Sequence, residues 1–135
     1  AFGEKLAALF TPGSHGSTFA GNPLGAAAGL ATLDVIEDEN LVANAEARGE
    51  QLRDGIMATG NPLFVSVRGR GLLDAVELKH PCSHAVMNYC LEHGLIVNAV
   101  APNALRFAPP LIVTAQDVDQ ALAILKDVPT DLPDD

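Results

Sequence analysis

The chain has 135 residues, with 8 Lys+Arg against 17 Asp+Glu and a formal net charge of −9 at pH 7. A hydrophobic fraction of 48% excludes a disordered chain, and the length suffices for one domain core. The acidic excess argues against a nucleic-acid partner and against an anionic membrane surface. No apolar run is long enough for a transmembrane helix, and residues 1–15 show no signal-peptide pattern.

The first 40 residues combine a polar loop with a helix rich in Ala and Gly. Residues 11–18 are dense in turn formers. Asn22-Pro23 is typical of a helix start, because Asn caps free N–H groups and Pro suits the first helical position. We therefore predict a helix over about 24–36. A composition shift near Asn40 predicts a domain boundary there.

The remaining residues predict an α+β unit. Apolar spacing predicts helices over about 41–58 and 83–92, and a last helix that begins at Thr114 with a capping box closed by Asp117. Strands are predicted over 63–68 and 72–78, joined as a hairpin by a glycine turn, and over 95–97 and 105–107. We expect a short, mainly antiparallel sheet of about four strands with helices packed on one face. The acidic, proline-broken residues 129–135 are predicted to fray.

Two places are candidates for ligand binding. Ser17 and Thr18 lie in a glycine-flanked turn before a helix, where hydroxyls and backbone N–H groups suit an anion such as phosphate. An ordinary helix-capping loop explains the same spacing. We interpret His15, in the same loop, as a residue that shapes it. Arg106 lies in an apolar strand, where it either points to solvent or binds a carboxylate as a bidentate fork.

These segments together resemble the class III (ornithine-type) aminotransferases, which use pyridoxal phosphate. The string Gly-Ser-His-Gly-Ser-Thr-Phe-Ala-Gly-Asn-Pro-Leu at residues 13–24 resembles the phosphate-loop motif of that family. Leu-Arg-Phe-Ala-Pro-Pro-Leu at residues 105–111 resembles its carboxylate-binding strand, and the hairpin around residues 69–72 also matches. Ile-Val-Asn-Ala-Val at residues 96–100 is most similar to the acetylornithine branch.

The resemblance implies a C-terminal part of a fold-type I transferase. Residues 1–40 would be a remnant of the large, cofactor-binding domain, residues 41–128 the small α+β domain, and residues 129–135 a tail. The start on Ala1 rather than Met agrees with a partial chain. The Schiff-base lysine of the family lies upstream of the phosphate loop, and Lys5, Lys79 and Lys126 are not in its motif. We therefore expect no catalytic residue here, and no transamination by this chain alone.

The resemblance also implies roles for three residues. Thr18 would bind the cofactor phosphate in the neighbouring active site of a homodimer, and Ser17 would lie beside it on the phosphate or substrate side. Arg106 would pair with the α-carboxylate of the substrate. The implied reaction moves the δ-amino group of N-acetylornithine to 2-oxoglutarate in the cytoplasm, as part of arginine biosynthesis. Ornithine, succinylornithine and 4-aminobutyrate remain alternative donors, because their enzymes share the phosphate loop.

Two readings of another class remain open. One is a metal site, because five potential zinc ligands fall within fourteen residues: His80, Cys82, His84, Cys90 and His93. Their spacing fits no standard zinc finger, and a buried thiol on a helix face is common, so we expect no metal. The two cysteines predict no disulfide framework and favour a reducing compartment. The other reading is a non-catalytic partner or regulatory module with the small-domain fold.

Overall fold

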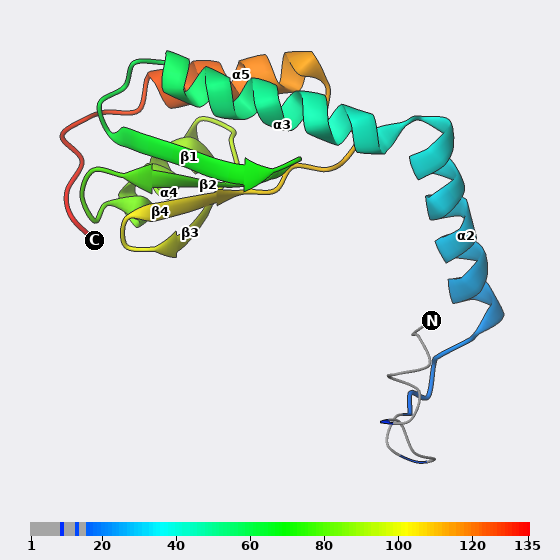
Figure 1. The fold of residues 1–135 in the computed structure, drawn as a ribbon. Coiled ribbons are helices and arrows are strands. Elements are labelled where there is room, and N and C mark those ends of the chain that lie inside the picture. The colour runs from blue at the N-terminus through cyan, green and yellow to red at the C-terminus, as the bar shows by residue number, and fades with distance from the viewer. Residues whose placement is uncertain (1–8, 10–12, 14–15) are drawn as a thin grey trace. The chain divides into compact units, whose positions relative to one another are not determined.

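The computed structural model describes residues 9, 13 and 16–135 of the chain (Figure 1). These residues belong to two compact units that meet in the sequence between Val35 and Ile36. The first unit contains most of helix α2 (Pro23–Asp38), and the second contains the sheet and the other described helices.

Helix α2 begins where the sequence predicts. The side-chain oxygen of Asn22 accepts a hydrogen bond of 2.7 Å from the backbone N–H of Gly25, and Pro23 is the first helical residue. This bond satisfies one of the N–H groups that a helix start leaves free. The helix continues to Asp38, two residues beyond the predicted end.

The second unit is built on a four-stranded antiparallel sheet in the order β1-β2-β4-β3. The strands are β1 (Phe64–Arg70), β2 (Leu73–Leu78), β3 (Asn98–Ala101) and β4 (Ala104–Phe107). The predicted fold class is therefore confirmed. One strand prediction is wrong, because β3 follows residues 95–97 instead of containing them. The N–H of Leu95 donates to the carbonyl of Cys90 at 2.8 Å, so this segment completes the preceding helix end.

Three helices cover one face of this sheet: α3 (Leu41–Ala58), α4 (Ser83–Glu92) and α5 (Ala115–Lys126). Figure 1 shows α3 and α5 side by side along it. All three helices contribute buried side chains to one core with the strands, among them Ile56, Val86, Leu125, Val76 and Leu105. The predicted capping box of Thr114 and Asp117 is present at the start of α5. Within the second unit, no described helix lies on the opposite face of the sheet, to which every second side chain of a strand points.

A polar link joins the β1–β2 turn to α3. The guanidinium of Arg53 donates to the Asp74 carboxylate and to the Gly71 carbonyl, both at 3.0 Å. Asp74 is 1% exposed, and this burial raises the pKa of its carboxyl, while the bond from Arg53 lowers it. The same turn packs closely against α3, since a Cβ on Gly49 would overlap the Gly71 carbonyl.

The acidic tail does not fray, contrary to the prediction. The Asp135 carboxylate accepts hydrogen bonds from the Ser83 hydroxyl and the His84 backbone N–H, both at 3.0 Å, at the start of α4. Partial burial works against ionisation of Asp135, but the bonds from His84, Ser83 and Ala85 outweigh it and lower the pKa to about 2. His80 faces Asp134 at 2.7 Å. A carboxylate at a helix N-terminus is stabilised by the free N–H groups there, which explains the docking.

Candidate functional site

Arg106 lies on the face of the sheet that the helices of the second unit, α3, α4 and α5, leave uncovered. Its neighbours in β4, Leu105 and Phe107, are buried in the core, so the alternation of the strand turns Arg106 to the opposite side, where it is exposed. The sequence left two possibilities for this side chain, solvent or a ligand. The structure places it on an open face next to two hollows.

A row of four residues crosses the sheet at this level. Arg68 in β1 is in register with Ala75 in β2, Ala75 with Arg106 in β4, and Arg106 with Asn98 in β3. Two strand spacings separate the two arginine backbones, or about 10 Å. Ala75 between them is small, which leaves the space above it open. A hollow of about 520 Å³ lies there, lined by both arginines, Ala75 and the apolar Leu73 and Val100 among others.

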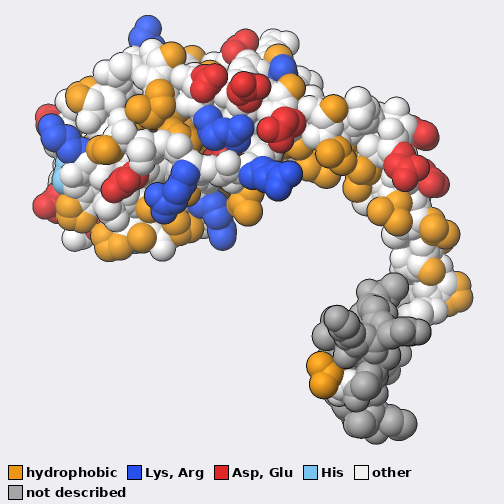
Figure 2. Space-filling model, viewed as in Figure 1, with side chains coloured by type: hydrophobic (Ala, Val, Ile, Leu, Met, Phe, Trp, Pro, Cys, Tyr) orange, Lys and Arg blue, Asp and Glu red, His pale blue; other side chains and the backbone are white. Residues whose placement is uncertain are grey.

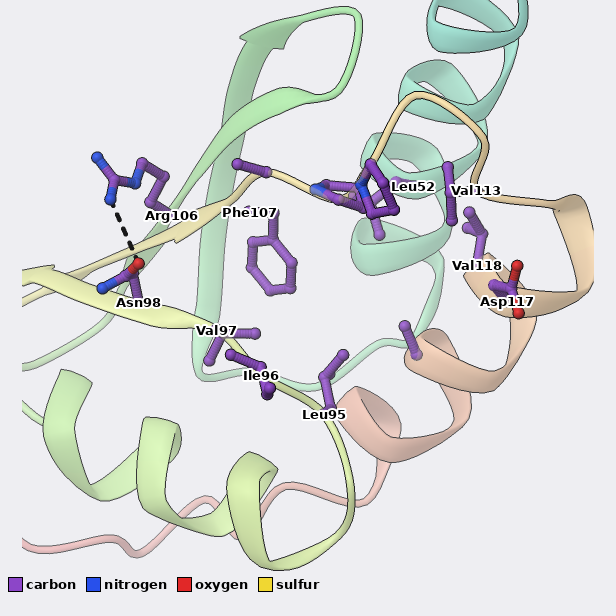
Figure 3. Close-up of a pocket in the computed structure, with 14 residues that line it drawn as sticks. Leu52, Leu95, Ile96, Val97, Asn98, Arg106, Phe107, Val113, Asp117 and Val118 are labelled. Atoms are coloured by element: carbon purple, nitrogen blue, oxygen red, sulfur yellow. Dashed lines mark hydrogen bonds between the residues drawn. The ribbon is translucent and has the colours of Figure 1, made fainter. Parts of the chain in front are cut away.

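The guanidinium of Arg106 is held by one neighbour. Its Nη2 donates to the side-chain oxygen of Asn98 at 3.3 Å (Figure 3). Within the described part of the chain, Arg106 forms no ion pair with a carboxylate. Its positive charge is therefore not neutralised by any described acid. Sequence reasoning missed Asn98, because its position opposite Arg106 depends on where β3 begins.

An apolar cavity of about 400 Å³ opens beside the same two residues. Figure 3 shows Phe107 and Val97 on one side of it and Leu52, Val113 and Val118 from or near the helices on another, with Asn98 and Arg106 at its edge. Asp117, which also lines the cavity, is engaged in the capping box: its carboxylate accepts from the Thr114 N–H at 2.9 Å and from the Thr114 hydroxyl at 2.7 Å. These bonds lower the pKa of Asp117. An apolar cavity with one polar edge is typical of a small-molecule site.

The basic side chains of this face stand out in an acidic chain. Figure 2 shows several Lys and Arg side chains over the strands, and Asp and Glu side chains chiefly toward α3. A local positive field of this kind attracts small anions even when the net charge is negative.

Ser17 and Thr18 lie in the first unit, in an exposed turn before α2. The turn is closed by a bond from the Ala20 N–H to the Ser17 carbonyl, at 3.3 Å. Neither hydroxyl forms a hydrogen bond to another residue of the described part of the chain. The N–H of Gly25 is not available, since Asn22 accepts it. Two exposed hydroxyl residues next to a helix start fit a phosphate group. Lys5 and His15 lie outside the described residues.

The five candidate metal ligands are not brought together. Cys82 and Cys90 are buried in the core, and burial raises the pKa of both thiols, to about 11 for Cys90. His80 and His84 bond to aspartates of the tail, and the His93 ring stacks on the tyrosine one turn before it. Among residues 9, 13 and 16–135, no group of three or more His, Cys, Asp or Glu is arranged to hold a metal ion.

Within the part of the chain that the structure describes, no helix combines the length and the apolar character needed to cross a membrane.

The fold and the site define a class of protein: a small α+β domain with helices on one sheet face and an exposed arginine on the other. The family model "Aminotransferase class-III" matches residues 2–128. The chain belongs to the class-III aminotransferases, whose members depend on pyridoxal phosphate. The resemblance inferred from the motifs is confirmed.

Similar proteins share this family. The chain is 45% identical over 133 residues to the acetylornithine aminotransferase of Gloeobacter violaceus, covering 96% of this chain and 33% of the relative. It is 46% identical over 123 residues to the ornithine aminotransferase of Staphylococcus carnosus, covering 89% and 30%. The chain thus spans about a third of the length of the curated relatives that it matches.

Solved structures agree with the fold. The acetylornithine aminotransferase of Elizabethkingia anophelis has a TM-score of 0.77 at 38% identity, over 89% of this chain and 33% of that one. The ornithine δ-aminotransferase of Plasmodium falciparum has a TM-score of 0.80 at 31% identity, over 91% and 33%. A structure of the Toxoplasma gondii ornithine aminotransferase, with a TM-score of 0.79 at 35% identity over 90% of this chain and 30% of that one, is described with pyridoxal phosphate at its active site.

Proposed function

We propose that the chain is the C-terminal part of an aminotransferase that moves the δ-amino group of N-acetylornithine to 2-oxoglutarate, in arginine biosynthesis. Residues 1–40 would belong to the large domain, residues 41–128 would form the small domain, and residues 129–135 the tail. Relatives named acetylornithine and ornithine aminotransferases support this assignment. Ornithine is the second candidate donor, because relatives of both names match at about the same identity.

The position of Arg106 is the single observation that carries the proposal. Arg106 is exposed, forms no ion pair with an acid of the described chain, and is one of the residues that line an apolar cavity. A planar guanidinium binds a carboxylate through two parallel hydrogen bonds, which fixes the orientation of an amino acid as well as its position. We assign to Arg106 the α-carboxylate that both N-acetylornithine and 2-oxoglutarate carry.

Ser17 and Thr18 are assigned to the cofactor phosphate. The exposure of both residues supports this role, since each hydroxyl can donate one hydrogen bond to a phosphate oxygen. We propose that the loop reaches the neighbouring subunit of a homodimer, with Thr18 on the phosphate and Ser17 beside it, on the phosphate or substrate side. When bound, pyridoxal phosphate supplies the carbon that carries the amino group between the substrates and the ring that withdraws electrons from it.

We propose a cytoplasmic location for the protein. Its support is the chemistry of Cys82 and Cys90, which are free thiols buried in the core. Free, buried cysteines are typical of proteins in reducing compartments.

The test uses the complete reading frame that contains this chain, purified with pyridoxal phosphate. Transfer to 2-oxoglutarate is measured from N-acetylornithine, ornithine, succinylornithine and 4-aminobutyrate, and we expect the highest kcat/KM with N-acetylornithine. A preference for ornithine would assign the second candidate. No transfer from any of the four donors would refute the proposed function.

Two variants test the residue roles. We expect Arg106→Ala to raise KM for the amino donor about tenfold to a hundredfold, the range for losing a charge-assisted bidentate bond. Arg70→Ala is the matched control, because it removes another exposed arginine from the same sheet. Thr18→Ala should speed the loss of cofactor on dialysis, read from the cofactor absorbance, whereas Thr130→Ala in the tail should not. Unchanged kinetics in Arg106→Ala would contradict its role.

A further inference from the structure

Asn98 contacts the functional group of Arg106 directly. The two residues are register partners on the edge strand β3 and its neighbour β4, and the 3.3 Å bond joins Arg106 Nη2 to the Asn98 side-chain oxygen. Both side chains are exposed on the face of the sheet without a helix, and both line the cavity of about 400 Å³. From this geometry we propose that Asn98 is a positioning residue that orients the Arg106 guanidinium for the substrate carboxylate. This inference rests on the proposed function.

The position of Asn98 in the fold suits this role. Its backbone is fixed by pairing with β4, and the segment before it is fixed by the Leu95 bond to the end of α4. The side chain therefore starts from a rigid edge strand. An arginine has four rotatable side-chain bonds, and one fixed acceptor near its tip removes much of that freedom before the ligand arrives. The remaining guanidinium donors stay free for a carboxylate.

The chemistry of an amide explains why the residue is Asn and not Asp. An amide oxygen accepts a hydrogen bond from the guanidinium but leaves its positive charge unneutralised. A carboxylate at the same place would form an ion pair with Arg106 and compete with the substrate carboxylate for it. No described acid pairs with Arg106. Asn98 thus orients the arginine and preserves its charge at the same time.

The test compares four variants in the complete, cofactor-loaded protein. We expect Asn98→Ala to raise KM for the amino donor about fivefold with kcat nearly unchanged, the effect of one exposed hydrogen bond that contributes to binding alone. Asn98→Asp should raise KM at least about tenfold, because it adds competition for the guanidinium. Asn98→Gln, which keeps a neutral amide oxygen, should stay closer to wild type than Asn98→Asp. Asn103→Asp adds the same charge in the β3–β4 turn and should leave KM unchanged.

A second measurement separates this inference from the proposed function. Glutarate, a dicarboxylate that cannot accept an amino group, is titrated calorimetrically into each variant and into Arg106→Ala. If Arg106→Ala weakens glutarate binding and raises KM but Asn98→Asp does neither, the positioning role is refuted and the proposed function stands. If Arg106→Ala changes neither quantity, the carboxylate-binding role of Arg106 fails and the positioning role of Asn98 fails with it, whereas the proposed function fails only if the wild-type protein transfers no amino group. If Asn98→Asp lowers the melting temperature and kcat with KM unchanged, Asn98 is only structural and the inference is overturned.

Discussion

Gly49→Ala reverses the usual effect of this substitution in a helix. Gly49 is buried in the interior of α3, where Gly→Ala ordinarily stabilises a helix by about 1 kcal/mol. Here the new methyl group would lie far closer than 3.0 Å to the carbonyl of Gly71, in the β1–β2 turn. That neighbour is backbone, so the helix and the turn must move apart.

The size of the loss follows from three contributions. Overpacking of this kind costs about 1–3 kcal/mol. Movement of the turn also breaks the 3.0 Å bond from Arg53 to the Gly71 carbonyl, which contributes about 1 kcal/mol. Set against the propensity gain of about 1 kcal/mol, the net loss is about 2 kcal/mol.

Urea unfolding of the 135-residue chain, followed by far-UV circular dichroism, measures this loss. With a slope of about 2 kcal/mol/M, the midpoint should fall by about 1 M. The matched control is Gly55→Ala in the same helix, whose methyl group would meet the end of the Leu122 side chain. A side-chain end can rotate away, so Gly55→Ala should remain within about 1 kcal/mol of wild type. If Gly49→Ala were as stable as wild type or as this control, the close approach of the turn to α3 would be wrong.

Two further predictions concern charged groups. Arg53→Met should lower the free energy of unfolding by about 2–3 kcal/mol, because it leaves the Asp74 carboxyl buried without its partner. Burial already raises the pKa of Asp74, so this deficit should grow as the pH rises from about 4 toward neutrality; a deficit independent of pH would contradict it. Asp135→Asn should lower the free energy of unfolding at neutral pH, because the neutral amide lacks the negative charge that the N–H groups at the start of α4 stabilise. Since the folded state lowers the pKa of Asp135 to about 2, the wild-type advantage should disappear as the pH falls from about 4 to about 2; urea midpoints over that range would show an unchanged gap if the reasoning were wrong.

The sequence predicted those features that depend on neighbouring residues. The Thr114–Asp117 capping box, the Asn22 cap and the helix over 41–58 each rest on contacts within one or two turns, and each is present. The hairpin at residues 69–71 was likewise recognisable from glycine between two alternating apolar runs. Local patterns of this kind need no knowledge of the rest of the fold.

The features that the sequence did not predict depend on residues far apart in the chain. The tail binds to the start of a helix about 50 residues earlier in the chain. The sequence of an acidic, proline-broken segment does not indicate which helix it will contact. Gly49 in α3 contacts the turn of the β1–β2 hairpin, which lies elsewhere in the sequence. From the sequence alone, Gly49 is therefore recognised only as a residue of low helix propensity. Leu95 forms a hydrogen bond to the end of α4, so β3 begins only at Asn98. This later start places Asn98 opposite Arg106.

The core and the candidate site are two results of one alternating pattern. Leu105 and Phe107 are 0% and 6% exposed, and their burial fixes the backbone of β4. The arginine between them must then emerge on the open face at a defined point of the sheet. A shift of one residue in register would bury its charge and expose both apolar neighbours, at a cost of several kcal/mol. The same burial that stabilises the domain therefore also holds Arg106 in place, and Asn98 has only the tip of the side chain left to orient.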